Sequence, residues 1–591
     1  MMQRSEATTL QKALERAAEF PDAGLRLLDR REQPEWLSWS DVFEESRQVA
    51  LGLRRVGVSR GDRVALVFPT EKGFFFGFFG ALLAGAVPVP LYPPVRLGRL
   101  EEYHARTASL LQAVSARVVL VSSRVRGILG QTMEQADPEL GCLVLEDLPS
   151  GDGRLPEASP EDLALVQFSS GTTVDPKPVA LTHHAVMAQV KALNRFWPDT
   201  TEVRHSGASW LPLYHDMGLI GCVFPALERP SVLTLIPPEV FVARPGVWLR
   251  AISRYRATVS PAPNFAYGLC VDKVPDEAME GVDLSCWKVA LNGSEPVAPA
   301  VLRRFAEHFA RWGFSPRALT PVYGLSEASL AVTFSPIERR FLTQSFERRA
   351  LSERGLALPE PDGIELVSVG QPLPGFRISV RDEAGQENRD GSVGRIWVQG
   401  PSLMKEYLDR PGSTAAVLRD GWLDTGDLGV RVEGELFITG RAKDVLIVRG
   451  QNHAPEELEF ALAGLKSVRK GCVAAVSHRP ESSEAEAVWL FVERSSSGSR
   501  QTPEAIEESC RQEVLKTSGI AVDRVVVLEP GTLPRTSSGK IRRAETLRRF
   551  LADELTPAGP VSALVLTRSW WRSSRAFQRW RRRRRGGWKS T

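Results

Sequence analysis

Short apolar runs alternate with longer helical patterns through the first three quarters of the chain. The run RVALVF (63–68) precedes a helix-like stretch at 71–85, AVPVP follows that stretch, and ARVVLVSS (116–123) comes after a second helical pattern. Two more continuous apolar runs are LALVQFSS (163–170) and SVLTLIPP (231–238). Such runs are typical of parallel strands that are buried on both faces. The alternation predicts an α/β fold, with a large domain that has several subdomains and buried sheets.

A second pattern begins after Arg441. Four strand-like runs, DVLIVRG, VAAVSHR, AVWLFVE and RVVVLEP, alternate with helical segments at 455–465 and 502–517. This predicts a small α+β domain. We therefore expect a large domain at 1–441, a small C-terminal domain at 442–555 and a separate tail at 556–591.

One uncharged stretch has the length of a membrane span. Residues 73–95 carry no charge, but four prolines interrupt the second half of the stretch: Pro88, Pro90, Pro93 and Pro94. The part before them is too short to cross roughly 30 Å of hydrocarbon. We predict a buried helix followed by a buried strand.

Composition excludes a wholly disordered chain, because 43% of the residues are apolar and 25% are charged. The six cysteines form no CxxC pair, so they indicate neither a zinc site nor a disulfide framework. The first twenty residues carry charges throughout and have no apolar core of a secretory signal. We expect a cytoplasmic protein.

The net charge of +4 hides an uneven distribution. No acidic residue follows Glu554, and the tail holds nine arginines and Lys589, a charge of +10 that leaves −6 for residues 1–554. Arginines recur at helical spacing at 568, 572, 575, 579 and 582, with Trp570, Phe577 and Trp580 roughly opposite. The tail is therefore either a basic amphipathic helix at an anionic membrane surface, on the inner face of the membrane, or a solvated disordered segment. A third alternative is a contact with an acidic partner such as an acyl carrier protein; nucleic acid is not the partner we expect.

The first candidate for a binding loop is the run FSSGTTVDPKP (168–178), which follows a strand-like segment. Its small side chains, hydroxyls and free backbone N–H groups can surround a phosphate, and Lys177 adds a positive charge. The loop lacks the GxxxxGK[ST] spacing of a Walker loop. The candidate phosphate-binding residues are Ser169, Ser170, Gly171, Thr172, Thr173 and Lys177.

Six motifs in one order resemble those of the adenylate-forming, AMP-binding superfamily of acyl-CoA synthetases, luciferases and adenylation domains. They are the phosphate loop, LNGSEP (291–296), YGLSEAS (323–329), WLDTGDLG (422–429), GRAKDVLIVRG (440–450) and PRTSSGK (534–540). WLPLYHDMGLIG (210–221), SPAPNFAYGLC (260–270), DLSCWKVALNGSEPV (283–297) and LVSVGQPLPG (366–375) are similar to the fatty acyl-AMP ligases in particular. Residues 335–365 occupy the place where those ligases carry an insertion that hinders the domain rotation needed for CoA transfer. Two positions differ from the superfamily pattern: Val174 and Pro178 stand where glycine is common.

The resemblance implies ATP and Mg²⁺ as cofactors and a mobile small domain that pivots at Lys443. Adenylation brings a carboxylate to the α-phosphate of ATP, so the site must supply positive charge to two anions. The resemblance assigns that role to Lys540, and it assigns the Mg²⁺ to Glu327.

The remaining implied roles concern the nucleotide and the acyl chain. Asp427 and Arg441 hold the ribose, Tyr323 stacks on adenine, and Ser326 lies near the α-phosphate. The nucleotide segments add Gly293, Ser294, Glu295 and Gly324. His215, Asp216, Met217, Phe265 and Ala266 are candidates for the acyl pocket.

The expected function is activation of a fatty acid to acyl-AMP, followed by transfer of the acyl group to an acyl carrier protein. The first alternative is a fatty acyl-CoA synthetase of the same fold. The second alternative is a catalytically silent protein that binds ATP or acyl-adenylate, for which Pro178 is the only indication.

Overall fold

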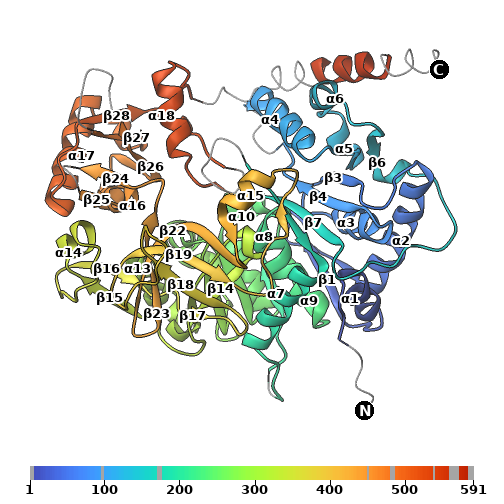
Figure 1. The fold of residues 1–591 in the computed structure, drawn as a ribbon, viewed down its shortest axis with the longest axis horizontal. Helices are drawn as coiled ribbons and strands as arrows, with labels where there is room; N and C mark the ends of the chain where they lie inside the picture. The colour runs from blue at the N-terminus through green and yellow to red at the C-terminus, as the bar shows by residue number, and fades with distance from the viewer. Residues whose placement is uncertain are drawn as a thin grey trace.

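The computed structural model describes residues 6–94, 99–169, 176–201, 203–448, 451–478, 486–536, 539–557 and 571–582. A large N-terminal domain with several sheets lies beside a small C-terminal domain, drawn orange to red in Figure 1. This is the α/β arrangement expected from the sequence.

The longest sheet has nine strands. In order they are β17 (Gln371–Pro372), β14 (Ala331–Phe334), β13 (Leu319–Gly324), β12 (Val289–Asn292), β11 (Val259–Ala262), β9 (Gly207–Ser209), β10 (Val232–Leu235), β1 (Gly24–Leu28) and β2 (Pro34–Ser38). Strands β12 and β13 run parallel, with Asn292 opposite Pro321. Because carboxyl ends of parallel strands meet at one edge, the loops after these two strands lie side by side.

A second sheet is fully parallel. It contains β4 (Val87–Leu91), β3 (Arg63–Val67), β5 (Val118–Val121) and β6 (Gly141–Val144). The uncharged stretch forms the buried helix α3 (Lys72–Leu83) and then β4, as predicted. At Gly80 a Cβ would lie 2.5 Å from Val49 Cγ1 of α2 (Trp39–Arg55), so glycine permits this helix contact. In the part of the chain that the structure describes, no helix has both the length and the apolar character to span a membrane.

One strand prediction needs correction. Strand β7 (Leu163–Phe168) is antiparallel to β8 (Pro178–Thr182), and β20 (Glu406–Tyr407) is antiparallel to β8 on its other side. A strand that is buried on both faces has a continuous apolar run whichever way its neighbours point, so the run does not report direction.

The rest of the large domain contains a five-stranded sheet, a two-stranded sheet and helices. The strands are β18 (Arg377–Arg381), β19 (Gly394–Gln399), β21 (Leu418–Arg419), β22 (Trp422–Val432), β23 (Glu435–Arg441), β15 (Thr343–Phe346) and β16 (Ile364–Val367). The helices are α1 (Leu10–Ala17), α4 (Leu100–Ala113), α5 (Ser123–Arg126), α6 (Gly130–Ala136), α7 (His183–Phe196), α8 (Asp216–Gly218), α9 (Phe224–Glu228), α10 (Pro238–Ala243), α11 (Gly246–Arg254), α12 (Asn264–Lys273), α13 (Pro299–Phe309), α14 (Arg348–Glu353) and α15 (Pro411–Val417).

The small domain has its own apolar cores, formed by residues between Leu446 and Leu555. Its strands are β24 (Leu446–Val448), β25 (Gln451–His453), β26 (Val468–His478), β27 (Ala487–Arg494) and β28 (Arg524–Leu528), and its helices are α16 (Pro455–Ala461), α17 (Pro503–Ser518) and α18 (Arg543–Leu551). Strands β24 and β25 precede α16, β26 and β27 precede α17, and β28 precedes α18, in agreement with the predicted small α+β domain.

Residues 571–582 form a helix, here called the terminal helix, which lies on the large domain near α6 (Figure 1). Ser573, Ala576 and Trp580 are buried at helical spacing, and Trp580 extends the apolar core of the four-stranded sheet. The indole N–H of Trp580 donates to Asp137 Oδ1 at 2.7 Å. The helix therefore packs along one face.

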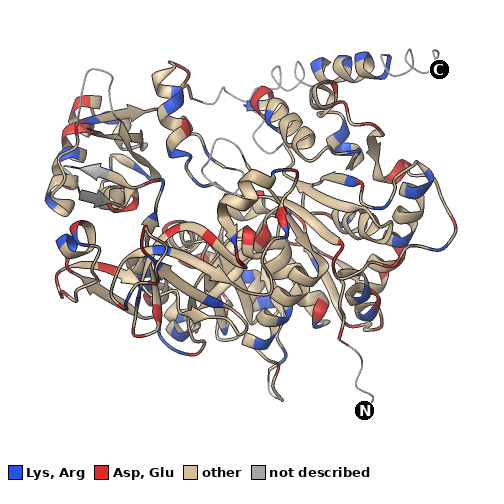
Figure 2. Ribbon diagram, in the orientation of Figure 1, with Lys and Arg blue, Asp and Glu red and all other residues tan. Residues whose placement is uncertain are grey.

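Two arginines of the terminal helix pair with the large domain: Arg572 with Glu101 at 2.9 Å and Arg579 with Glu134 at 2.8 Å. Figure 2 shows the basic positions of this helix as blue bands along its ribbon. The helix expected from the arginine spacing is thus present, but Phe577 and Trp580 pack on the protein's own sheet rather than facing a membrane. The disordered alternative is also wrong for these residues. Arg568 and Trp570 lie outside the described residues.

Candidate functional site

The ends of β12 and β13 bring two of the predicted motifs together. Gly293 follows β12, and a Cβ there would lie 2.9 Å from the carbonyl oxygen of Val322 on β13, so glycine permits the close approach. The next residue, Ser294, has a φ of 71°, in the left-handed region that non-glycine residues adopt rarely. The backbone N–H of Phe265 donates to Glu295 Oε1 at 2.6 Å, which fixes that carboxylate at the strand end.

Gly324 is the last residue of β13 and lies against the backbone of Leu330. A Cβ there would lie 1.8 Å from the carbonyl oxygen of Leu330, so glycine permits this close approach. The preceding residue, Tyr323, is buried, and its hydroxyl donates to Asp427 Oδ2 at 2.7 Å. Arg441 Nε lies 3.0 Å from Asp427 Oδ1, across the β22–β23 pair. Burial and the neighbouring Asp427 raise the pKa of Tyr323, so its hydroxyl stays a donor. The structure therefore joins the predicted adenine and ribose residues in one hydrogen-bonded set.

Asp216 links the predicted acyl-pocket motif to the predicted α-phosphate residue. Ser326, at the start of a 3₁₀ turn, donates its hydroxyl to Asp216 Oδ2 at 2.5 Å, and His215 Nδ1 lies 2.6 Å from Asp216 Oδ1. Burial would raise the pKa of Asp216, but His215 and the hydrogen bond from Ser326 lower it to about 2. Asp216 is therefore a buried, ionised carboxylate between the two motifs.

Glu327 follows Ser326 and accepts a hydrogen bond from Tyr407, a residue outside the predicted site. The hydroxyl of Tyr407 on β20 donates to Glu327 Oε1 at 2.7 Å. Burial raises the pKa of Glu327, and this hydrogen bond lowers it. No local pattern marks Tyr407, because its contact depends on the pairing of β20 with β8.

The phosphate loop is closed at its base. The backbone N–H of Ser169 donates to the carbonyl oxygen of Lys177 at 3.0 Å, and the N–H of Lys177 donates to Ser169 Oγ at 3.3 Å. Pro178 begins β8, and its carbonyl oxygen accepts from the N–H of Leu408 at 2.8 Å. The candidates Ser170, Gly171, Thr172 and Thr173 lie outside the described residues.

Lys540 lies on the small domain, and its charge interacts with residues of this site. Burial, and then the charge of Arg441, lower the pKa of Lys540, whereas Asp216, Glu295 and Asp427 oppose the shift. The ammonium is thus within electrostatic range of carboxylates from three separate segments of the large domain. Its own turn is held by the backbone N–H of Lys540, which donates to Thr536 Oγ1 at 3.0 Å.

The acyl-pocket candidates differ in exposure. Met217 and Ala266 are buried, whereas Phe265 is 41% exposed, and its ring meets Trp210 edge to face at 5.8 Å. The N–H of Met217 donates to Asp216 Oδ1 at 2.7 Å, and the N–H of Phe265 donates to Glu295 Oε1 at 2.6 Å, so both candidates lie beside a carboxylate of the site.

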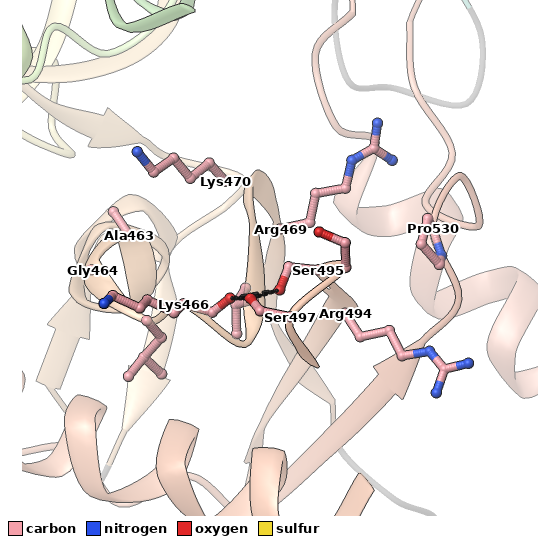
Figure 3. Close-up of a pocket in the computed structure, with 12 residues that line it drawn as sticks. Ala463, Gly464, Lys466, Arg469, Lys470, Arg494, Ser495, Ser497 and Pro530 are labelled. Atoms are coloured by element: carbon pink, nitrogen blue, oxygen red, sulfur yellow. Dashed lines mark hydrogen bonds between the residues drawn. The ribbon is translucent and has the colours of Figure 1, made fainter. Parts of the chain in front are cut away.

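A separate cavity of about 580 Å³ lies in the small domain, between the start of β26 and the end of β27. Its lining includes four cationic side chains, but Figure 3 shows that their charged ends point in different directions. Arg469 pairs with Glu493 at 2.8 Å, and Lys470 pairs with Asp272 of α12 at 2.9 Å. The cavity therefore offers no convergent charge, and none of the predicted site residues lines it.

Comparisons with known proteins identify the family of the chain. The family model described as AMP-binding enzyme matches residues 14–408. A putative acyl-CoA synthetase of Caulobacter vibrioides is 35% identical over 92% of this chain and 95% of its own. Long-chain-fatty-acid–AMP ligase FadD26 of Mycobacterium tuberculosis is 33% identical over 91% of this chain and 96% of its own.

Solved structures are also similar. One from a study of fatty acyl-adenylate ligases of E. coli and L. pneumophila has a TM-score of 0.85 and 33% identity, over 92% of this chain and 98% of its own. The fatty acyl-adenylate ligase of L. pneumophila in complex with acyl adenylate and pyrophosphate has a TM-score of 0.70 and 28% identity, over 92% and 96%. The shared fold, the ordered motifs and the matching family model lead to one conclusion: the chain belongs to the AMP-binding enzyme family.

Proposed function

We propose that the protein uses ATP to activate a fatty acid as its acyl-adenylate, with release of pyrophosphate. The observation that carries this proposal is the set formed by Tyr323, Asp427 and Arg441, with Lys540 of the small domain within electrostatic range of Asp427. The relatives named as fatty acid–AMP ligases support the choice of substrate.

In the proposed reaction an oxygen of the fatty carboxylate forms a bond to the α-phosphorus, and the bond from that phosphorus to pyrophosphate breaks. Lys540 reduces the repulsion between the carboxylate and the α-phosphate, and the closed loop at Ser169 and Lys177 receives the pyrophosphate. Asp427 and Arg441 hold the ribose, and the aromatic ring of Tyr323 supports the adenine.

The residues present fit a magnesium ion. Mg²⁺ prefers oxygen ligands and is commonly bound by one or two carboxylates together with substrate phosphates. Glu327 suits this need, because Tyr407 occupies its Oε1 and the carboxylate has a second oxygen. When bound, the ion would neutralise charge that develops on the phosphate oxygens.

In the second proposed step the acyl group passes to the phosphopantetheine thiol of an acyl carrier protein, and AMP leaves. Support comes from residues 335–365, which contact the small domain: Arg348 pairs with Glu457 of α16, and its Nη2 donates to the carbonyl oxygen of Thr517 of α17 at 3.2 Å. These contacts join the segment to the domain that would pivot at Lys443. Because one relative is named a putative acyl-CoA synthetase, CoA is the alternative acceptor.

Hydroxamate trapping of the adenylate tests the first step, with fatty acids of graded chain length and with the Lys540→Ala variant. We expect trapped product with the wild type and a loss of roughly 10²- to 10³-fold in the variant. Full adenylation by Lys540→Ala would refute the assignment of Lys540. Absence of pyrophosphate release in the wild type with every acid would instead favour the silent binding protein.

The second step is tested separately. Wild-type protein charged with acyl-adenylate is offered CoA or a carrier protein that bears phosphopantetheine, and the thioester product is measured. Product with the carrier alone supports the proposal, and equal product with CoA refutes the preference for the carrier.

A further inference from the structure

Tyr407 touches two predicted functional groups that come from separate loops. Its hydroxyl donates to Glu327 Oε1 at 2.7 Å, and Lys177 Nζ lies 4.5 Å from the centroid of its ring. The first group is the predicted metal ligand, and the second is the lysine of the phosphate loop. One buried side chain thus bridges the metal side and the pyrophosphate side of the proposed nucleotide site.

The backbone around Tyr407 makes the same connection. Tyr407 is paired with Val179 in the β20–β8 register, and the N–H of Leu408 donates to the carbonyl oxygen of Pro178 at 2.8 Å. On the other side, the N–H of Met404 donates to the carbonyl oxygen of Glu327 at 2.7 Å. The segment 404–408 therefore holds the base of the phosphate loop and the turn of Glu327 at a set separation.

We propose that Tyr407 is a positioning residue that holds the Glu327 carboxylate toward the metal ion with its hydroxyl and the Lys177 ammonium toward pyrophosphate with its ring. This inference rests on the proposed adenylation function. The phenol O–H takes one carboxylate oxygen, which restricts rotation of the group and turns the other oxygen to a hard cation. The ring face attracts the ammonium electrostatically, which restricts a flexible side chain that would otherwise sample many rotamers.

The two roles belong to different parts of one side chain, so two substitutions separate them. Tyr407→Phe removes the hydroxyl and keeps the ring, whereas Tyr407→Leu removes both. Tyr103→Phe is the matched control, because Tyr103 is also buried but donates its hydroxyl to the main-chain carbonyl of Tyr92 at 3.2 Å.

The test measures binding rather than turnover alone. Electron paramagnetic resonance follows Mn²⁺ binding to each variant in the presence of ATP, and inhibition by added pyrophosphate reports on the phosphate loop. For Tyr407→Phe we expect Mn²⁺ affinity to fall about tenfold, as for loss of one hydrogen bond to a charged group, with an unchanged pyrophosphate inhibition constant. For Tyr407→Leu both constants should weaken. Tyr103→Phe should match the wild type in both.

The outcomes also separate this inference from the function on which it rests. If the wild type forms acyl-adenylate and Tyr407→Phe binds Mn²⁺ as tightly as the wild type does, the positioning role of the hydroxyl is overturned. If Tyr407→Leu keeps the wild-type pyrophosphate constant, the role of the ring is overturned. If the wild type itself forms no adenylate with any fatty acid, the proposed function fails first.

Discussion

Lys540 combines a positive charge with a site that lowers its pKa. Burial, and then Arg441, favour loss of its proton, while Asp216 and Glu295 oppose that loss. Only the protonated ammonium can offset the charge of the carboxylate and the α-phosphate. Rising pH should therefore reduce adenylation as it passes through this lowered pKa, at a lower pH than for an ordinary lysine.

Substitution by arginine tests this pH dependence. Arginine keeps its charge at any pH that the protein tolerates, so Lys540→Arg should move the alkaline decline of kcat/KM for ATP to higher pH, even if its maximal rate is lower. The measurement is a pH profile of pyrophosphate release. Lys516→Arg, on the surface of α17, is the control. An unchanged decline in Lys540→Arg would assign the titration to another group.

At this same scale, the motifs predicted which residues would meet. Tyr323 lies 104 residues before Asp427 in the chain, and the two share one set with Arg441 of the next strand. Their proposed roles in binding nucleotide stay predictions. Tyr407 could not be found in this way, because its contact with Glu327 spans 80 residues and depends on a strand register. Local patterns carry no information on such pairing.

At the scale of single elements, the terminal helix contains two tryptophans that differ in exposure. Trp580 is buried and donates to Asp137, whereas Trp571 is 54% exposed. Removal of a buried indole leaves a cavity, a cost of about 3–5 kcal/mol when the site cannot collapse. Trp580→Ala should detach the helix and speed tryptic cleavage between residues 571 and 582 about tenfold or more.

Trp571→Ala is the matched control and should be cleaved at the wild-type rate. Equal cleavage of all three proteins would contradict the docking of the helix on the large domain. Flotation with anionic vesicles provides a second readout. The docked helix should bind vesicles weakly in the wild type, because the apolar side is already covered.

The sequence patterns predicted most elements because period and burial are local properties. The apolar run at 163–168 identified a strand, but the direction of its partner lies in the longer-range topology. The arginine spacing of the tail was compatible with a helix and with a disordered segment, and an amphipathic face does not say whether its partner is lipid or protein. The structure answers that question through Ala576 and Trp580.

For the molecule as a whole, the contacts between the domains govern the proposed second step. Arg348 pairs with Glu457, and a partly buried pair of this kind contributes about 1 kcal/mol to the conformation shown, or roughly a fivefold change in population. Arg348→Ala should therefore increase thioester formation with CoA several-fold and leave adenylate formation unchanged.

The control is Arg349→Ala, because this neighbour is 82% exposed and lies near Glu353 of its own helix. Adenylate formation is measured with fatty acid and ATP, and thioester formation is measured separately with purified acyl-adenylate. Unchanged use of CoA in Arg348→Ala would mean that the segment 335–365 does not limit the choice of acceptor.

The docking of residues 571–582 determines how movement between the domains could be observed. A fluorophore on the exposed side of this helix, for example at residue 582, would stay fixed to the large domain although it follows the small domain in the chain. A second dye on α17 would travel with the small domain. Energy transfer between the two dyes would then follow each catalytic cycle in real time, without a label near the nucleotide.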